Sequence, residues 1–203
     1  MSQSTSSFQP ARSTSLPRAL FLDRDGTVIV HIPYLHKPDE VALAPRAREA
    51  LLRAREAGFL LYLFTNQSGV GRGMFGLEDV HAVNRRMIEL LDLGEAIFAG
   101  ICIAPESPDM PPVYRKPSPR YILETCAADG LDPRQCWMIG DSPTDWEAGR
   151  AAGMQSVAVG CDAQESSQQR AYREERGVPG YETLEDAVDA ILRGAADPIS
   201  AKP

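Results

Sequence analysis

The sequence predicts an α/β fold, a Rossmann-like three-layer sandwich in which helices cover both faces of a mostly parallel sheet. Short apolar runs alternate with segments of helical periodicity along most of the chain, a pattern typical of parallel strands joined by right-handed crossovers. The length of 203 residues, of which 43% are hydrophobic, suits one domain built around one core.

Five apolar runs predict strands that are buried on both faces of the sheet. The first covers residues 19–22 and ends at Asp23, and the second covers residues 59–64 and ends at Thr65. The remaining strands are predicted at residues 97–103, 137–139 and 156–159. None of these runs approaches the ~18 residues that a membrane span requires.

Five segments with helical periodicity connect or follow these runs. The first begins at Pro45 and ends before Gly58, residue types that favour the first turn and the end of a helix. The others are predicted at residues 77–93, 119–128, 145–152 and 184–192. Thr183 and Asp186 form a predicted capping box at the start of the last helix.

We expect a single domain over residues 18–193, with a flap at residues 28–44. Residues 1–17 are Ser-rich and nearly uncharged, and they are expected to form a disordered tail, as are residues 194–203. Residues 161–180 interrupt the alternating pattern with a polar segment rich in Gln and Glu. This segment predicts a surface loop or a loose helix.

Charge and cysteine usage exclude several classes of protein. The chain has 21 Lys and Arg against 28 Asp and Glu, so no overall field attracts nucleic acid or an anionic membrane. The arginines of residues 46–55 are expected to form only the solvated face of a helix. The four cysteines form no C-x-x-C pair, which indicates neither disulfides nor a Cys-rich zinc site. With no secretory signal in view, a cytoplasmic location is expected.

Polar residues follow the predicted strands at one edge of the sheet. Asp23, Thr65 and Asp141 each follow or closely trail an apolar run, and Asp25 and Lys116 belong to the same series of polar motifs. Parallel sheets bind ligands at the carboxyl ends of their strands. We therefore expect these side chains to form one site.

The chemistry of these residues points to phosphoryl transfer assisted by a divalent cation. Asp23 and Asp25 are two residues apart, so they share one side of a strand-like segment, and a hard cation offsets their repulsion. Asp141 is the natural third metal ligand beside Asp23 and Asp25. Once charge is screened, an Asp can attack phosphorus while Asp25 serves as general acid and then base. Thr65 and Lys116 would bind the phosphoryl oxygens.

Four short motifs carry these residues in a fixed order. They are residues 23–27 (D-R-D-G-T), 65–67 (T-N-Q), 115–117 (R-K-P) and 140–145 (G-D-S-P-T-D). This order resembles that of haloacid-dehalogenase-superfamily phosphatases. The resemblance implies Asp23 as the nucleophile, Asp25 as the general acid and base, and Mg²⁺ as the metal. It also implies that the backbone carbonyl of Asp25, rather than its side chain, completes the metal shell.

Residues 21–25, 31–34 and 65–73 narrow the likeness further. They resemble the subgroup that contains D-glycero-D-manno-heptose 1,7-bisphosphate phosphatase and histidinol-phosphatase, and the likeness covers about residues 18–160. In that subgroup the segment after the first motif and the T-N-Q-S turn contact the substrate. The resemblance therefore places these residues near the leaving group: Tyr34, Asn66, Gln67, Ser68 and Arg115.

The chain departs from this subgroup in one loop. Members often bind structural zinc through Cys and His residues between the third strand and the Lys motif, whereas only Cys102 remains here. Residues 104–114 hold four prolines and neither Cys nor His, so no zinc is expected. Residues 27–45 and 104–114 are both too few for a cap domain, which implies an open site.

Other classes of protein fit the motifs less well. An EF-hand loop starting at Asp23 is disfavoured, because Thr27, Val28 and Tyr34 occupy its fifth, sixth and twelfth positions. A phosphorelay receiver domain also combines acidic residues, Mg²⁺, Thr and Lys, but its phosphorylated Asp follows the third strand, where this chain has none. Asp145 either supports the metal site or only begins a helix. The expected partner is a small phosphorylated metabolite, such as heptose bisphosphate or histidinol phosphate, and the protein is expected to be a monomer.

Overall fold

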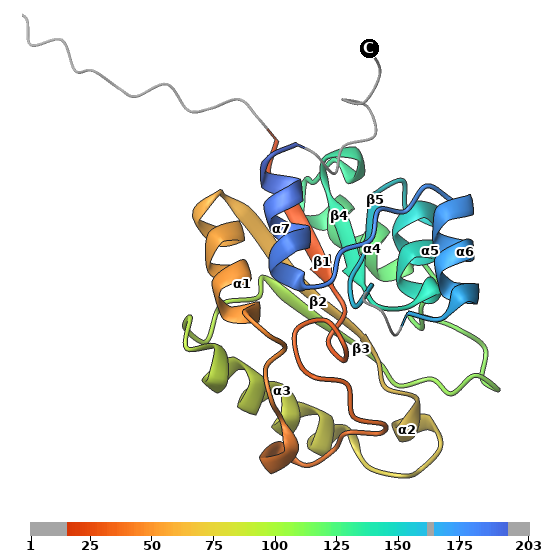
Figure 1. The fold of residues 1–203 in the computed structure, drawn as a ribbon. Helices are drawn as coiled ribbons and strands as arrows, with labels where there is room; N and C mark the ends of the chain where they lie inside the picture. The colour runs from red at the N-terminus through yellow and green to blue at the C-terminus, as the bar shows by residue number, and fades with distance from the viewer. Residues whose placement is uncertain (1–15, 162–164, 195–203) are drawn as a thin grey trace, which may run out of the picture.

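The sheet has five parallel strands in the order β3-β2-β1-β4-β5. The computed structural model describes residues 16–161 and 165–194 of the chain (Figure 1). The strands are β1 (Arg18–Leu22), β2 (Phe59–Asn66), β3 (Gly100–Ala104), β4 (Trp137–Gly140) and β5 (Gln155–Ala158). The order reverses at β1, so a switch point lies at the centre of the sheet, where parallel α/β folds bind ligands.

Helices cover both faces of the sheet and complete three layers. One face carries α1 (Ala47–Glu56), α3 (Leu77–Leu91) and α7 (Leu184–Leu192), and the other carries α4 (Arg120–Asp129) and α5 (Pro143–Ala151). Figure 1 shows α6 (Ser167–Glu175) beside α5. The short α2 (Ser68–Gly71) follows β2, and two 3-10 turns occupy η1 (Pro38–Glu40) and η2 (Pro133–Gln135).

The central strand β1 shows why both faces are apolar. Leu20 and Leu22 pack into the core beneath α1, α3 and α7, whereas Ala19 and Phe21 pack against α4 and α5. Successive side chains of a strand point to opposite faces, so a strand between two helical layers must be apolar at every position. The predicted fold class, including the strands buried on both faces, is therefore confirmed.

The predicted elements agree with the structure except at some boundaries. β3 begins at Gly100 rather than at Ile97, because Ile97 and Phe98 are buried in the turn that precedes it. The predicted cap of the last helix is present: the Thr183 hydroxyl accepts a hydrogen bond from the Asp186 amide at 3.1 Å. The short α2 was not predicted, since four residues carry no periodicity.

The segment expected to be a surface loop or a loose helix contains the helix α6. α6 begins after Ser166, whose hydroxyl accepts from the Gln169 amide, and Glu165 forms ion pairs with Arg170 and Arg173. The sequence of α6 has no apolar stripe that would predict a helix, and none of its residues is buried in the structure. Capping and ion pairs hold this helix where hydrophobic periodicity is missing.

Two arginines, one in α1 and one just before it, pair with α7. Arg46 and Arg53 both form ion pairs with Glu185, and Arg53 also contacts Asp189 at 3.0 Å. The positive charges on this helix are therefore balanced within the protein, as expected for a solvated helix face.

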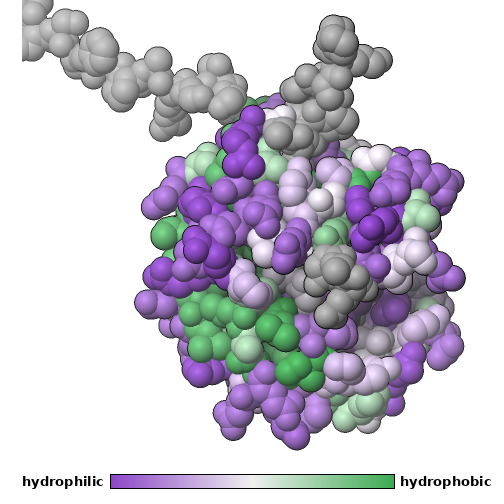
Figure 2. Space-filling model, in the orientation of Figure 1, coloured by the Kyte–Doolittle hydropathy of each residue, from purple (hydrophilic) through white to green (hydrophobic). Residues whose placement is uncertain are grey.

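The predicted flap, residues 28–44, contains only η1 and two isolated bridges that involve Ile29. The loop between β3 and α4 holds neither helix nor strand, so no cap domain is inserted in either interval. Figure 2 shows hydrophobic residues gathered on the surface over the flap, where Val30 is 43% exposed. The expected tails fall mainly on residues 1–15 and 195–203, outside the described residues. Across the part of the chain that the structure describes, no helix combines the length and apolarity needed to cross a bilayer.

Candidate active site

Three motifs meet at the carboxyl edge of the sheet because their strands are parallel neighbours. Asp23 follows β1, Thr65 lies near the end of β2, and Asp141 follows β4. The amide of Asp23 donates to the carbonyl of Ile139 at 2.9 Å, which continues the β1–β4 register to the site itself. The structure therefore brings Asp23, Thr65 and Asp141 to one edge of the sheet, as predicted.

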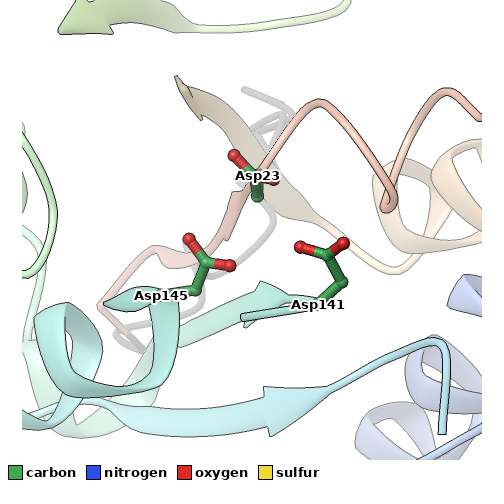
Figure 3. Close-up of side chains that lie close together, drawn as sticks. All are labelled: Asp23, Asp141 and Asp145. Carbon is green, nitrogen blue, oxygen red and sulfur yellow. The ribbon is translucent and has the colours of Figure 1, made fainter. Parts of the chain in front are cut away.

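Three carboxylates form an acidic cluster at this edge. Oxygen atoms of Asp23, Asp141 and Asp145 all lie within 4.8 Å of one another, and Figure 3 shows the three side chains facing a common space. Burial, together with the charges of Asp23 and Asp145, raises the pKa of Asp141 to about 8. Three carboxylates this close together repel one another, and their all-oxygen donor set fits Mg²⁺.

Gly26 explains how Asp141 can approach the first motif. Gly26 has φ of +82°, and a Cβ atom at this position would overlap the carboxylate of Asp141. Glycine is therefore required here both for the backbone conformation and for the close packing of a cluster carboxylate. This gives a physical reason for the glycine of the D-x-D-G-T motif.

Lys116 lies within the cluster. Its Nζ atom is 2.6 Å from oxygens of both Asp23 and Asp145 and 2.7 Å from the carbonyl of Phe64, and its side chain is 1% exposed. Burial alone would lower the pKa of Lys116, but the carboxylates of Asp145 and Asp23 outweigh it and hold the pKa above its usual value. Lys116 is therefore a fixed positive charge beside Asp23.

Asn66 fixes the backbone of Lys116 rather than pointing into open space. Its side-chain oxygen accepts from the Lys116 amide at 2.9 Å, and its Nδ2 donates to the Lys116 carbonyl at 3.2 Å. This bidentate contact ties the end of β2 to the loop before α4. The side chain expected to contact substrate is thus committed to Lys116 in this structure.

Gln67 connects Thr65 to Asp25. Its Nε2 atom donates to the Thr65 hydroxyl at 2.8 Å and to a carboxylate oxygen of Asp25 at 3.0 Å. A hydroxyl that accepts a hydrogen bond still has its own proton to donate. Thr65, which is fully buried, is therefore oriented as a donor.

Asp25 faces away from the acidic cluster. Its carboxylate receives hydrogen bonds from Arg24 and Gln67, and it is not among the clustered carboxylates. Burial raises the pKa of Asp25, Arg24 opposes this shift, and the charge of Asp23 adds to it. The structure thus separates the Asp25 side chain from Asp141, and its role as a side-chain metal ligand stays a prediction.

Arg24 is a residue of this site that sequence reasoning missed. Its guanidinium is completely buried, and it donates to Asp25 and, at 3.0 Å, to Asn84 of α3. A charged residue directly after a buried strand and between two acids was the available signal, because such a position leaves little access to water. Arg24 fixes the orientation of Asp25.

A cavity of about 280 Å³ opens beside Asp25. The predicted substrate residues Tyr34, Asn66, Gln67 and Ser68 line it, together with residues that include Arg24, His31 and Phe75. Tyr34 adopts φ of +56° and is 42% exposed at the rim, on the flap. Arg115 does not line this cavity; its guanidinium donates to the carbonyl of Glu106 at 3.2 Å.

Known proteins resemble this chain over most of its length. A family model described as HAD-hydrolase-like matches residues 113–187. The D-glycero-D-manno-heptose-1,7-bisphosphate 7-phosphatase of Chlorobaculum tepidum is 39% identical over 155 residues, which cover 70% of this chain and 78% of that protein. The chain belongs to the HAD-like phosphatase family.

Another relative and two solved structures agree with this assignment. The heptose bisphosphate phosphatase of Mesorhizobium japonicum is 38% identical over 67% of this chain, which spans 66% of that relative's length. A D,D-heptose 1,7-bisphosphate phosphatase from B. bronchiseptica, complexed with magnesium and phosphate, superposes with a TM-score of 0.76 at 26% identity, covering 88% of this chain and 99% of the other. An HAD-like phosphatase from Mesorhizobium loti superposes with a TM-score of 0.70 at 33% identity, covering 91% of this chain and 90% of the other.

Membership of the HAD-like phosphatase family decides between the classes left open by the sequence. The family consists of phosphoric monoester hydrolases, so the receiver-domain alternative is wrong. Within the acidic cluster, Asp23 is the carboxylate that both contacts Lys116 and lies beside Asp141.

Proposed function

We propose that this HAD-like protein is a Mg²⁺-dependent phosphatase of a small sugar phosphate, D-glycero-D-manno-heptose 1,7-bisphosphate being the first candidate. The observation that carries the proposal is the position of Asp23. Its carboxylate contacts the buried Lys116 at 2.6 Å and borders the Asp141 carboxylate, while Asp25 lies on the side of the cavity. The carboxylate of Asp23 is thus held by the positive charge of Lys116, and the carboxylate of Asp25 lines the cavity proposed for the substrate.

Asp23 is the proposed nucleophile. Its carboxylate oxygen attacks phosphorus and the bond to the sugar oxygen breaks, which leaves an aspartyl-phosphate on Asp23. Lys116 and the Thr65 hydroxyl bind the phosphoryl oxygens, where negative charge spreads in the transition state. Their fixed positions, set by Asn66 and Gln67, mean that little reorganisation is needed during the reaction.

Asp25 is the proposed general acid and base. Its raised pKa favours the protonated form that gives a proton to the departing sugar oxygen. The resulting carboxylate then takes a proton from the water that attacks the aspartyl-phosphate, which releases inorganic phosphate and restores both aspartates. Arg24 and Gln67 keep the Asp25 carboxyl aimed at this position throughout.

The residues that would hold Mg²⁺ are Asp23 and Asp141, with the backbone carbonyl of Asp25. When bound, the ion would screen the negative charges of the carboxylates and of the substrate phosphoryl group. Asp145 supports Lys116 from behind and, through its other oxygen, accepts from the Ser142 amide at 3.0 Å at the start of α5. It therefore serves both the site and the helix.

The proposal includes no zinc, a monomer and a cytoplasmic location. Burial raises the pKa of Cys102 to about 12, which disfavours the thiolate that zinc requires. The four free cysteines are compatible with a reducing compartment. Elemental analysis of protein purified without chelator tests the first point, and stoichiometric zinc would contradict it.

A phosphate-release screen with Mg²⁺ tests the proposed function. The panel would hold the heptose bisphosphate, histidinol phosphate, nucleoside monophosphates and simple hexose phosphates, with Asp23→Asn protein as the control for contaminating phosphatases. We expect the heptose bisphosphate to give the highest kcat/KM. A preference for histidinol phosphate or a nucleotide would overturn the substrate assignment, and no Mg²⁺-dependent release from any ester would overturn the enzyme class.

A further inference from the structure

Glu106 is a buried acid in the loop between β3 and α4. Its Oε1 atom accepts hydrogen bonds from the backbone amides of Val113 and Tyr114 at 2.9 and 2.8 Å, and the residue is 6% exposed. Its Oε2 atom is buried without a hydrogen-bond partner among the described residues, and Glu106 forms no ion pair with them. The Glu106 carboxylate therefore links the start of this loop to its end, at Val113 and Tyr114.

A buried carboxylate without a cation is an expensive way to close a loop. Burial pushes the pKa of Glu106 up, but backbone amides, those of Tyr114 and Val113 among them, hold the pKa below its usual range. The group is therefore charged at neutral pH, and its charge is balanced by amide dipoles. A neutral polar residue would be a less costly alternative if closing the loop were the only requirement.

The loop that Glu106 closes leads directly into the active site. Arg115 follows the two amides that bind the Glu106 carboxylate, and its guanidinium donates to the Glu106 carbonyl at 3.2 Å. The Glu106 carboxylate thus holds the backbone just before Arg115, whereas the guanidinium of Arg115 is bound by the Glu106 backbone carbonyl. Lys116 comes next, but Asn66 and two carboxylates hold it independently of Glu106.

The other end of the loop is fixed against α2. The Gly71 amide donates to the Pro105 carbonyl at 2.9 Å, and a Cβ atom at Gly71 would overlap that carbonyl and the Ser107 amide. This close packing fixes the start of the loop at Pro105, and Glu106 then connects that fixed point to the backbone before Arg115.

We propose that Glu106 is a positioning residue that holds Arg115, which lies next to Lys116 and outside the cavity beside Asp25, for contact with the non-reacting, anionic or hydroxyl-rich part of the substrate. This inference rests on the proposed phosphatase function. Because Lys116 is held separately, loss of Glu106 should weaken substrate binding through Arg115 and leave the phosphoryl-transfer step largely intact. The planar guanidinium suits a second phosphate or a pair of hydroxyls.

A double-mutant cycle tests the proposal with the best substrate of the panel and with p-nitrophenyl phosphate. For the sugar phosphate, Glu106→Ala and Arg115→Ala should each raise KM ~10-fold with kcat changed less than ~3-fold, and the double variant should resemble Arg115→Ala. Glu106→Gln keeps one acceptor oxygen and should lose less. For p-nitrophenyl phosphate, which lacks the second group, KM should hardly change.

Two outcomes would overturn the proposal. Effects of Glu106→Ala and Arg115→Ala that multiply would show that the residues act separately. Equal falls in kcat on both substrates would show that Glu106 only maintains the structure. Glu124→Ala is the matched control, because Glu124 is exposed and contacts the Tyr114 hydroxyl but not the loop backbone. It should behave as wild type.

Hydrogen exchange provides a second measurement that does not depend on catalysis. In Glu106→Ala and Glu106→Gln protein, the amides of Val113 and Tyr114 should exchange faster than in wild type and in Glu124→Ala, with the core strands unchanged. Unchanged exchange in both variants would overturn the inference. If no phosphoester is hydrolysed, the proposed function fails while this readout still judges whether Glu106 holds the loop.

Discussion

The ammonium group of Lys116 lies 2.6 Å from a carboxylate oxygen of Asp145, and the two side chains are only 1% and 2% exposed. This buried pair joins the loop before α4 to the first turn of α5, two segments on the same side of the sheet. The pair leaves Asp23 as the second partner of Lys116. Asp145 thereby fixes the charge that faces the nucleophile.

Replacing Asp145 with Asn should destabilise the protein by about 1.5–3 kcal/mol, because Lys116 loses a charged hydrogen-bond partner while Asp23 remains as its second one. Activity should also fall, since the Lys116 ammonium loses the partner that fixes it beside Asp23. Urea unfolding measures the free energy. Asp92→Asn is the matched control, because Asp92 pairs with Arg48 at 3.9 Å on the surface and its loss should cost less than about 0.5 kcal/mol. Equal losses would refute the buried-pair account.

The parts of the site that lie at strand ends could be predicted from the sequence. Asp23, Thr65 and Asp141 each end or follow an apolar run, and parallel strands bring such positions to one edge. The fold followed from the same alternation of apolar runs and helical periodicity. These signals are local, so a single sequence contains them.

The parts that depend on distant partners could not be predicted. Arg24 contacts Asn84, sixty positions away, and Glu106 binds backbone amides, which no sequence pattern marks. The segment of α6 was predicted only as a surface loop or a loose helix for a related reason, because capping and ion pairs hold this helix without an apolar stripe. The substrate side of the site also depends on the flap, whose course follows from packing rather than from periodicity.

Mg²⁺ should stabilise the protein more at high pH than at low pH. Folding of the metal-free protein raises the pKa of Asp141 from 3.8, the ordinary value of an exposed Asp, to about 8. Between these two pH values, Asp141 therefore keeps its proton in the folded state and loses it in the unfolded state. The free energy of unfolding therefore falls as the pH rises through this window. Mg²⁺ needs the carboxylate and displaces the proton, so its stabilising effect grows over the same range.

Thermal unfolding with and without Mg²⁺, at about pH 6 and about pH 8, measures this linkage. The Mg²⁺-induced rise in Tm should be larger at the higher pH. Asp141→Asn protein cannot release this proton and should show a small rise that hardly depends on pH. A wild-type rise that is the same at both values, or larger at the lower one, would show that Asp141 does not bind the ion.

Thr65→Val should lower kcat by about 10²-fold, because it removes one hydrogen-bond donor to the phosphoryl group. Thr65→Ser keeps the hydroxyl and the contact with Gln67, and it should retain most of the activity. Steady-state kinetics on one substrate compare the two variants. If both lose activity equally, the hydroxyl is not the functional group at this position.

Asp25→Asn should affect substrates according to their leaving groups. A sugar phosphate needs a proton on its departing oxygen, so kcat should fall about 10²- to 10⁴-fold. The p-nitrophenolate group leaves without protonation, so the first step should survive and water attack should become slow. Rapid mixing should then show a burst of p-nitrophenol equal to the enzyme concentration. A uniform loss without a burst would remove Asp25 from the acid and base role.

Mass spectrometry of protein quenched in acid during turnover tests most directly the claim that Asp23 is the nucleophile. One phosphoryl group is expected on Asp23, at higher occupancy in Asp25→Asn protein and absent from Asp23→Asn protein, which should be folded and inactive. A phosphoryl group on another residue would contradict the account. So would substantial hydrolysis by Asp23→Asn protein.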